Sequence, residues 1–230
     1  MPIVGGPFSS LYVGDAQATD RRSRTFRRVV SANSYVIVPT GAGSLSTPDS
    51  ASLDITGDID IAVRLKVVTG ADGRLVTKGY PGTYCFGAND TVVFSEFNVG
   101  GGPFYPASAA HSVSNGSLTW LRLTRVASSG LVTHYKAADS VGVPSSWTSI
   151  GSTSSTTGSL SANSSALFIG SGTGGAEAYI HNIYRVVVKN GIDGTTVADF
   201  NPNLYATGST FTSTDGLVYT LTGTAAITKA

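Results

Sequence analysis

Apolar and polar residues alternate strictly over residues 59–67. The odd positions carry Ile, Val or Leu, whereas the even positions carry Asp, Ala, Arg and Lys. Because successive side chains of a β-strand point to opposite faces, this pattern predicts a long, half-buried strand with one apolar face and one charged face. Turn-forming residues at 47–50 and 56–58 precede the segment and indicate where the strand begins.

Similar apolar segments, separated by turn signals, follow one another from Tyr35 onward. We predict strands at 35–38, 74–80, 83–87, 92–97, 118–126, 131–136, 166–170, 178–188 and 195–200, and a final strand pair within 217–227. No segment combines helical periodicity with capping residues. Short strands at regular spacing predict an all-β protein, built as a two-sheet antiparallel sandwich.

Three segments between these strands are rich in small or turn-forming residues. Residues 70–73 read as a hairpin turn, and Gly100 begins a long loop that carries Tyr105. The Ser/Thr/Gly-rich segment 151–165 is expected to be a loop or a weak strand, with an interdomain linker as the alternative.

The composition narrows the class of protein. Only 13% of the 230 residues are charged, about half the usual share. Aromatic and β-branched residues occur throughout, which excludes an intrinsically disordered chain. The net charge of +1 gives no broad attraction to nucleic acid or to an anionic membrane, so we expect neither as a partner.

The single cysteine, Cys85, excludes an internal disulfide and a zinc site built on cysteines, and is expected to be buried. We expect no metal and no cofactor. Residues 1–10 lack the basic start and apolar core of a secretory signal, and no apolar run reaches the roughly 20 residues of a membrane span. We therefore expect synthesis in a reducing cytoplasm. His111, His134 and His181 stand in unrelated segments and are expected to be packing or surface residues.

Residues 1–34 are predicted to form a basic N-terminal arm that precedes a single domain at 35–230. Five of the ten arginines lie within residues 21–28, whereas ten basic and twelve acidic residues remain after Ser34, which gives the domain a formal charge of −2. Guanidinium groups docked on carboxylates form bidentate bonds that fix register. We expect the arm to bind a partner through apolar anchors and arginines; a disordered tail is the alternative. These residues are Phe8, Leu11, Tyr12, Arg21, Arg22, Arg24, Phe26, Arg27 and Arg28.

Four stretches, taken in order, carry a family resemblance. They are STPDSASLDITGDIDIAVRLKV (46–67), TWLRLTRVASSGLVTHYKAADS (119–140) with SWTSIG (146–151), IYRVVVKNGIDGTTVADFNP (183–202) and STDGLVYTLTGTAAI (213–227). Together they resemble laminin-G-like, concanavalin A-like jelly-roll domains, in particular those of virion proteins from phages that infect actinobacteria, such as minor tail proteins. The resemblance covers about residues 35–228. The disulfide frequent in secreted laminin-G modules is absent, and no metal ligands can be matched.

The resemblance implies a jelly-roll sandwich displayed on the surface of a virion after synthesis in the bacterial host cytoplasm. The arm would then attach the domain to capsid or tail proteins, as a capsid decoration or minor tail protein, and a homo-oligomer is expected. An adhesin that binds a host cell-surface glycan is the alternative function, and the two roles are compatible.

Glycoside hydrolysis is the least favoured function. Hydrolases of this fold family carry Glu-x-Asp-x-Glu on one strand, because a retaining enzyme needs two carboxylates about 5–5.5 Å apart. The nearest match here runs from Asp58 to Ala62, and the only glutamates, Glu96 and Glu177, each stand alone. We therefore expect no catalytic residues and no enzyme activity. Asp58 and Asp60 are expected to face solvent and pair with basic groups such as Arg64, with a hard-cation site as the alternative.

Aromatic and amide side chains in or beside predicted loops are the candidate ligand contacts. The faces of sugar rings stack on Tyr or Trp, while sugar hydroxyls bond to Asn and Asp. The alternative is that these large side chains cover the ends of the sandwich. The candidates are Tyr80, Tyr84, Asn89, Asp90, Tyr105 and Trp147.

Overall fold

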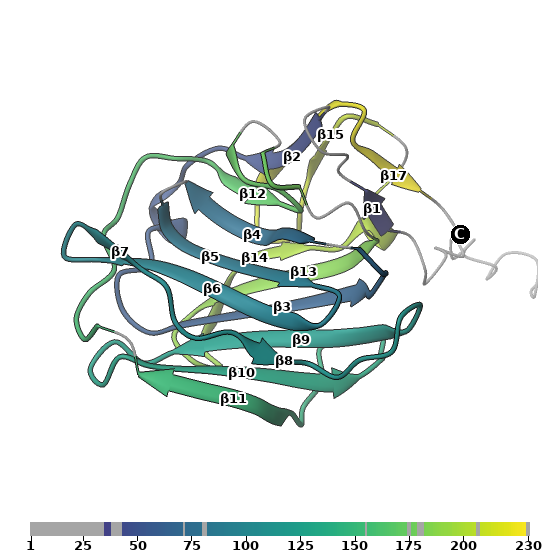
Figure 1. Cartoon of the computed structure of the whole chain (residues 1–230). Helices are drawn as coiled ribbons and strands as arrows, with labels where there is room; N and C mark the ends of the chain where they lie inside the picture. Colours follow the sequence, from purple (N-terminus) through teal and green to yellow (C-terminus); the bar gives the residue numbers. More distant parts are fainter. Residues whose placement is uncertain are drawn as a thin grey trace, which may run out of the picture. The chain divides into compact units, whose positions relative to one another are not determined.

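Two antiparallel sheets stack face to face in the computed structural model (Figure 1). The structure describes residues 35–37, 43–70, 72–79, 82–154, 156–173, 176–178, 182–205 and 208–228. The predicted arm, Tyr80 and His181 lie outside these residues. Within them, the prediction of an all-β, two-sheet antiparallel sandwich is confirmed.

The first sheet, called sheet A, has eight strands in the order β11-β10-β9-β3-β13-β1-β17, with β14 also paired to β13. The strands are β1 (Tyr35–Ile37), β3 (Ile59–Lys66), β9 (Leu118–Arg125), β10 (Leu131–Ala138), β11 (Thr148–Ser154), β13 (Ile183–Asn190), β14 (Thr195–Phe200) and β17 (Ala226–Thr228).

The second sheet, called sheet B, has nine strands in the order β15-β16-β2-β12-β4-β5-β6-β7, with β8 also paired to β6. The strands are β2 (Gly43–Thr47), β4 (Asp72–Gly79), β5 (Gly82–Asn89), β6 (Val92–Val99), β7 (Gly102–Phe104), β8 (Ala109–Ala110), β12 (Leu167–Ile169), β15 (Thr210–Thr212) and β16 (Val218–Gly223). Among the fully described elements, two are three-residue 3₁₀ turns between strands: η1 (Ala51–Leu53) and η3 (Pro202–Leu204). None of the helical segments described has the length or apolar character that a membrane crossing requires.

Strand β3 lies at the centre of sheet A, between β9 and β13. As predicted, its odd-numbered residues point into the core between the two sheets, where Ile61 and Val63 are fully buried. The prediction that its other face is open to solvent is wrong, because Asp60 is 2% and Arg64 is 3% exposed. Neighbouring side chains and the loop after β10 cover this face, so β3 is buried on both sides.

Two predicted strand pairings are wrong because the strands belong to different sheets. Residues 70–73 do not form a hairpin: β3 lies in sheet A and β4 in sheet B. Side chains fix the connection that crosses from sheet A to sheet B: the Thr69 amide donates to Asn115 Oδ1 at 2.8 Å and the Gly70 amide donates to Asp90 Oδ2 at 3.1 Å. In the same way, β16 joins sheet B and β17 joins sheet A.

Four pairs of successive strands form antiparallel hairpins: β4–β5, β5–β6, β9–β10 and β13–β14. Among the segments that differ from the predictions, two were expected as loops or weak strands. The loop expected from Gly100 contains β7, which pairs with β6. The segment expected at 151–165 as a loop or weak strand provides the second half of β11, the edge strand beside β10.

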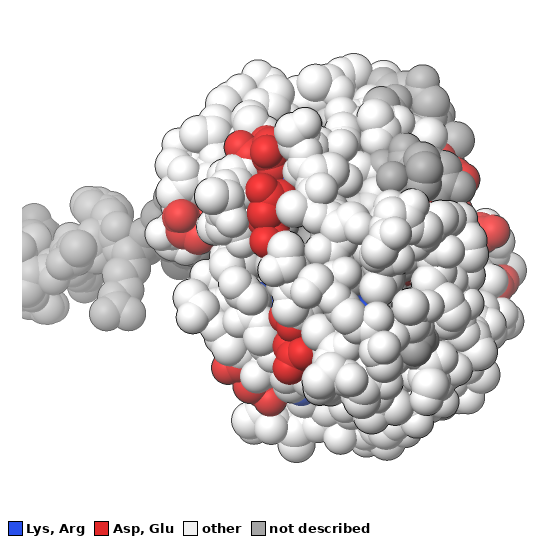
Figure 2. Space-filling view, turned by 90° about the vertical axis from the view of Figure 1, so that its left-hand side faces the viewer, with Lys and Arg blue, Asp and Glu red and all other residues white. Residues whose placement is uncertain are grey.

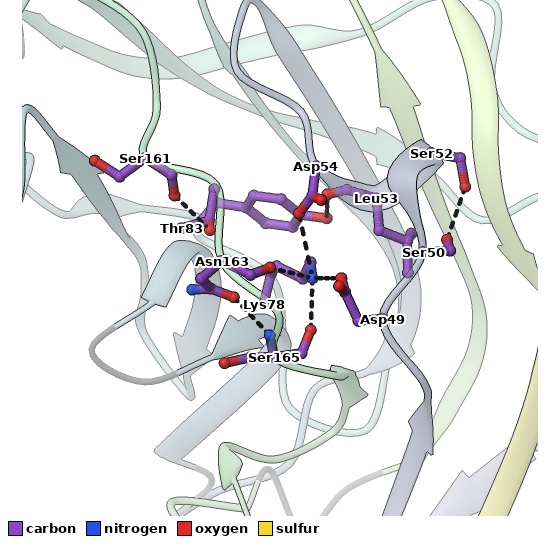
Figure 3. A network of polar contacts seen from close by, with 11 residues as sticks. Asp49, Ser50, Ser52, Leu53, Asp54, Lys78, Thr83, Ser161, Asn163 and Ser165 are labelled. Atoms are coloured by element: carbon purple, nitrogen blue, oxygen red, sulfur yellow. Dashed lines mark hydrogen bonds and ion pairs between the residues drawn. The ribbon is translucent and has the colours of Figure 1, made fainter.

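Lys78 binds two loops near the end of strand β4. Its ammonium group is fully buried and donates to Asp49, to the Asn163 carbonyl at 3.0 Å and to the Ser165 carbonyl, and lies 3.5 Å from Asp54 (Figure 3). Each of these partners belongs to a segment outside the strands, either 48–58 or 156–166. One buried cation therefore ties two loops to the end of β4.

A second buried cation holds the same Ser/Thr-rich segment from sheet A. Arg125 is fully buried, lies over the Phe97 ring at 5.5 Å and donates from Nη2 to the carbonyls of Thr156 at 2.9 Å and Gly158 at 2.8 Å. Burial lowers the pKa of this guanidinium, although Asp58 acts in the opposite direction. Between them, Arg125 and Lys78 fix the segment to one strand of each sheet, β9 and β4.

The two described histidines are buried, as expected for packing residues. His134 stacks on Phe86 with ring centroids 6.3 Å apart, and burial lowers its pKa to about 4. A hydrogen bond of 3.1 Å joins His111 Nε2 and the Asn89 carbonyl, and burial lowers the pKa of His111 as well. Both rings are therefore neutral in the folded protein near pH 7.

Replacing Lys78 by Met should lower the free energy of unfolding by about 2–4 kcal/mol, because loop carbonyls lose a buried donor and two carboxylates lose their cation. Chemical denaturation of the purified variant measures this loss. Lys66→Met is the matched control: Lys66 is half-buried at the end of β3, and its replacement should cost less than about 1 kcal/mol. Equal effects of the two substitutions would contradict the proposed role of Lys78.

Stability should decrease as the pH falls from about 6.5 toward 4. In that window the unfolded chain binds a proton at His134 that the folded protein excludes, which favours unfolding by up to about 3 kcal/mol. His111 acts in the same direction. Urea unfolding at about pH 7.5 and 5 should give a smaller pH difference for His134→Phe than for the parent; an unchanged difference would rule out His134 as a source.

Candidate functional site

Arg122 is the centre of a polar cluster on the outer face of sheet A. It lies on β9 opposite Ala62 of β3, and its guanidinium group forms two parallel bonds with Asp60: Nε to Oδ1 at 2.8 Å and Nη2 to Oδ2 at 2.7 Å. Both side chains are less than a tenth exposed. Burial alone would lower the pKa of Arg122, but the hydrogen bonds and charge of Asp60 raise it, so the guanidinium group stays charged.

The turn between β13 and β14 joins this ion pair. The Asp193 amide donates to Asp60 Oδ2 at 3.0 Å, and its carboxylate accepts from Arg122 Nη2 at 2.8 Å. Asp193 adopts a left-handed conformation with φ +53°, which Asp tolerates better than most residues. Its side chain is 71% exposed, so one carboxylate is held by a buried arginine while still facing solvent.

Trp147 packs against the same guanidinium group. Arg122 Cζ lies 5.3 Å from the Trp147 ring and 5.5 Å from the Tyr135 ring, distances typical of cation–π contacts. Trp147 also forms an edge-to-face contact with the buried Trp120, with ring centroids 6.4 Å apart and the rings perpendicular. Trp120 in turn donates from Nε1 to the Ser140 carbonyl at 2.9 Å, which anchors the loop that leads to Trp147.

These side chains surround a shallow pocket of about 30 Å³. Its lining residues are Asp60, Ala62, Arg122, Val143, Pro144, Trp147, Val187, Lys189 and Asp193. Such a volume holds about one water-sized group, so a ligand would insert a single substituent and rest its body on the rim. Val143, one of the apolar lining residues, is 36% exposed, so the pocket has an apolar rim.

Polar groups of the pocket remain available to a ligand. Among the described residues, no hydrogen-bond partner is found for Arg122 Nη1 or Trp147 Nε1, whereas Nε and Nη2 of Arg122 are both engaged. Asp193 offers an exposed acceptor. Donors, an acceptor and an apolar rim together suit a ligand that carries hydroxyl groups on a partly apolar body.

The structure corrects the predicted roles of Asp58, Asp60 and Arg64. Arg64 forms its bidentate pair with Asp139, at 2.7 and 3.0 Å, and lies over the Tyr184 ring at 5.3 Å. Asp58 instead accepts a 2.7 Å hydrogen bond from the Ala127 amide. Both oxygens of Asp60 are bound, and no cluster of three His, Cys, Asp or Glu side chains suited to a metal occurs in the described part of the chain.

The predicted ligand contacts do not converge. Trp147 lines the pocket, whereas Tyr105 is 61% exposed beyond β7 of sheet B. The prediction for Tyr84 is wrong: it is fully buried in β5 and donates to the Leu53 carbonyl at 3.3 Å. Asn89 stabilises the β5–β6 turn by accepting from the amides of Thr91 and Val92, and Asp90 fastens the crossing at Gly70.

Several site residues were not predicted as such. Arg122 and Lys189 come from alternating strands, where charged residues at outward positions signal either solvent or a partner on the neighbouring strand. Asp193 precedes Gly194 in the β13–β14 turn, and Asp-Gly is a turn-forming pair. The sequence pattern placed these residues on the right elements, but it did not show that a loop folds over them.

No protein-family model and no curated protein matches this chain. Several solved structures, in contrast, have a similar fold. A candidate carbohydrate-binding protein from Bacteroides ovatus superposes with a TM-score of 0.62 at 10% identity, covering 86% of this chain and 60% of the other. The extracellular region of zebrafish Gpr126/Adgrg6 gives 0.50 at 13% identity, covering 87% and 27%. Mouse laminin α1 domains LG4-5 give 0.49 at 10% identity, covering 80% and 50%.

These similarities concern the fold. At 10% identity, the Bacteroides ovatus structure establishes that the described chain shares the sandwich architecture of that protein. The chain spans about 60% of the length of that protein and less of the other two. Function has to be argued from the site itself.

Proposed function

We propose that this protein is a non-catalytic carbohydrate-binding protein, and that its sugar site is the pocket formed by Arg122, Trp147 and Asp193. One observation carries the proposal: unpaired donors and an exposed carboxylate lie beside an apolar rim, and a buried ion pair holds them in place. The fold similarity to a candidate carbohydrate-binding protein supports this assignment.

The geometry assigns a role to each residue. A ring substituent enters the small pocket and accepts a hydrogen bond from Arg122 Nη1, while a hydroxyl group donates to Asp193. The C–H face of the ring rests on Trp147 and on the apolar rim. Asp60 positions Arg122 and makes no ligand contact, because both of its oxygens are already bound. Since the groups are fixed before binding, little conformational entropy is lost.

Trp147→Ala should weaken glycan binding by the full-length protein about tenfold or more, as expected for loss of a central aromatic contact. A glycan array followed by calorimetry with the best ligand measures the change. Tyr105→Ala is the matched control, because it removes an exposed aromatic side chain from sheet B and should leave affinity unchanged. Loss of binding in the control alone, or in neither variant, would place the sugar elsewhere.

A virion role is a second, compatible candidate, and it rests on the four stretches that resemble phage virion proteins. We propose that the domain is displayed on a virion surface, as a capsid decoration or minor tail protein that forms a homo-oligomer. Residues 1–34 would attach it to capsid or tail proteins, and the sugar site would then face the glycans of the host envelope.

Changing Arg21, Arg22, Arg24, Arg27 and Arg28 together to Ser tests the attachment role. The melting temperature of the full-length protein should stay nearly unchanged, because exposed charges contribute little to stability. Retention on particles should become weak and salt-sensitive, since the contacts that remain are screened more easily. If the variant withstands a high-salt wash as well as the parent does, the arginines do not attach it.

A further inference from the structure

A second cavity lies on the outer face of sheet B. Along β6, Val93 and Phe97 point into the core, so the alternation places Phe94 and Glu96 on the opposite face. The cavity measures about 360 Å³ and is lined by Asp72, Gly73, Phe94 and Glu177. This volume falls within the usual range for small-molecule pockets. It belongs to β4 and β6, and so lies on the opposite side of the sandwich from the Trp147 pocket.

The Phe94 ring forms a fixed wall of this cavity. Its neighbour across the sheet is Gly87 of β5, and a Cβ atom at that position would lie 2.1 Å from Phe94 Cζ. The ring therefore packs directly on the glycine backbone, which supports it from below. Phe94 itself is half-buried, so part of the ring remains open to the cavity.

Arg74 brings the two glutamates of the chain together, although the sequence suggested that each stood alone. It donates from Nη1 to Glu96 Oε2 at 3.1 Å and from Nε to Glu177 Oε2. Nη1 also contacts Cys85 Sγ at 2.7 Å. Burial raises the pKa of the Cys85 thiol to about 11, although Arg74 acts in the opposite direction, so the thiol carries no charge near pH 7.

Glu177 is held in an unusual conformation by the same arginine. Its φ is +46°, a left-handed value that few residues other than glycine adopt, and such strain tends to occur at functional sites. The Arg74 amide donates to the Glu177 carbonyl at 2.9 Å, while the Arg74 side chain binds the Glu177 carboxylate. The Glu177 side chain is nevertheless 52% exposed. A carboxylate is thus fixed at the edge of the cavity.

Among the described residues, the lining of the cavity carries more negative than positive charge. Asp72 and Glu177 are its two carboxylates and no basic side chain lines it, while Arg74, which binds Glu177, is shared with the buried Glu96. Asp72 is exposed, and its carboxylate has no ion-pair partner among the described residues. An aromatic ring beside an excess of carboxylates favours a cation, because the ring face and the negative charges both attract it.

We propose that the Phe94–Asp72–Glu177 cavity is a second binding site, and that it takes a protonated amino sugar. The ammonium group lies between the Asp72 and Glu177 carboxylates, and the ring C–H face packs on Phe94. The neutral hydroxyl groups bond to the free carboxylate oxygens. The site is independent of the Trp147 pocket and lies on the other sheet, so a protein with both sites occupied could bridge two saccharides.

Saturation-transfer NMR and calorimetry with glucosamine, N-acetylglucosamine and glucose test this assignment on the full-length protein. At about pH 6.5, below the pKa of about 8 typical of such amines, glucosamine should bind at least about tenfold more tightly than the two neutral sugars. Glu177→Gln keeps a hydrogen bond to Arg74 but removes the negative charge of that side chain. Asp72→Asn removes the negative charge of the other carboxylate. Each should weaken glucosamine binding about three- to tenfold.

Phe94→Leu retains bulk over Gly87 and should weaken binding to a similar extent through loss of the aromatic face. In the Trp147→Ala protein, which lacks the central contact of the proposed glycan pocket, glucosamine should still bind and should still be weakened by Glu177→Gln, which separates the two sites. Absence of saturable glucosamine binding would overturn the proposal. So would equal binding of glucose, or loss of glucosamine binding in Trp147→Ala alone.

Discussion

The buried ion pair between Asp60 and Arg122 is the interaction on which the outer face of sheet A depends. It joins the two central strands, β3 and β9, and the same guanidinium group reaches Asp193 in the β13–β14 turn and the Trp147 ring in the loop after β10. Removing one partner of such a pair leaves an uncompensated buried charge, which typically costs about 3–5 kcal/mol. The pair therefore fixes a turn and a loop that alternation alone leaves undetermined.

Buried cations recur throughout the described domain. Every Lys and Arg in the described residues is buried or half-buried, whereas five carboxylates are exposed: Asp49, Asp72, Asp139, Glu177 and Asp193. Figure 2 shows the outcome on one face, where Asp and Glu reach the surface and Lys and Arg are almost absent. The buried cations Lys78 and Arg125 bind loop carbonyls, whereas Arg122 and Arg74 bind exposed carboxylates. The domain consequently presents a mildly acidic surface.

Most strand positions and the two-sheet architecture could be predicted from the sequence, because alternation and turn residues are local signals. The pairing between strands could not be predicted, because it depends on which sheet each strand joins; the segment at Gly70 has the residues of a hairpin turn but connects the two sheets. The burial of polar side chains could not be predicted either. Alternation marks Asp60 as polar, but only the fold shows a loop over it, and Tyr84 turned out to belong to the core. Trp147, predicted as a ligand contact, lies in the lining of the pocket on sheet A.

The chain contains two tryptophans, and this makes one measurement especially direct. Their indole N–H groups give separate signals in a ¹H–¹⁵N NMR spectrum, and only that of Trp120 has a protein acceptor in the described structure. Titration with a panel of saccharides should shift the Trp147 signal in a saturable manner and leave the Trp120 signal in place, with Trp147→Phe assigning the two. If no saccharide moves the Trp147 signal, or if both signals move together, the pocket on sheet A is not a carbohydrate site.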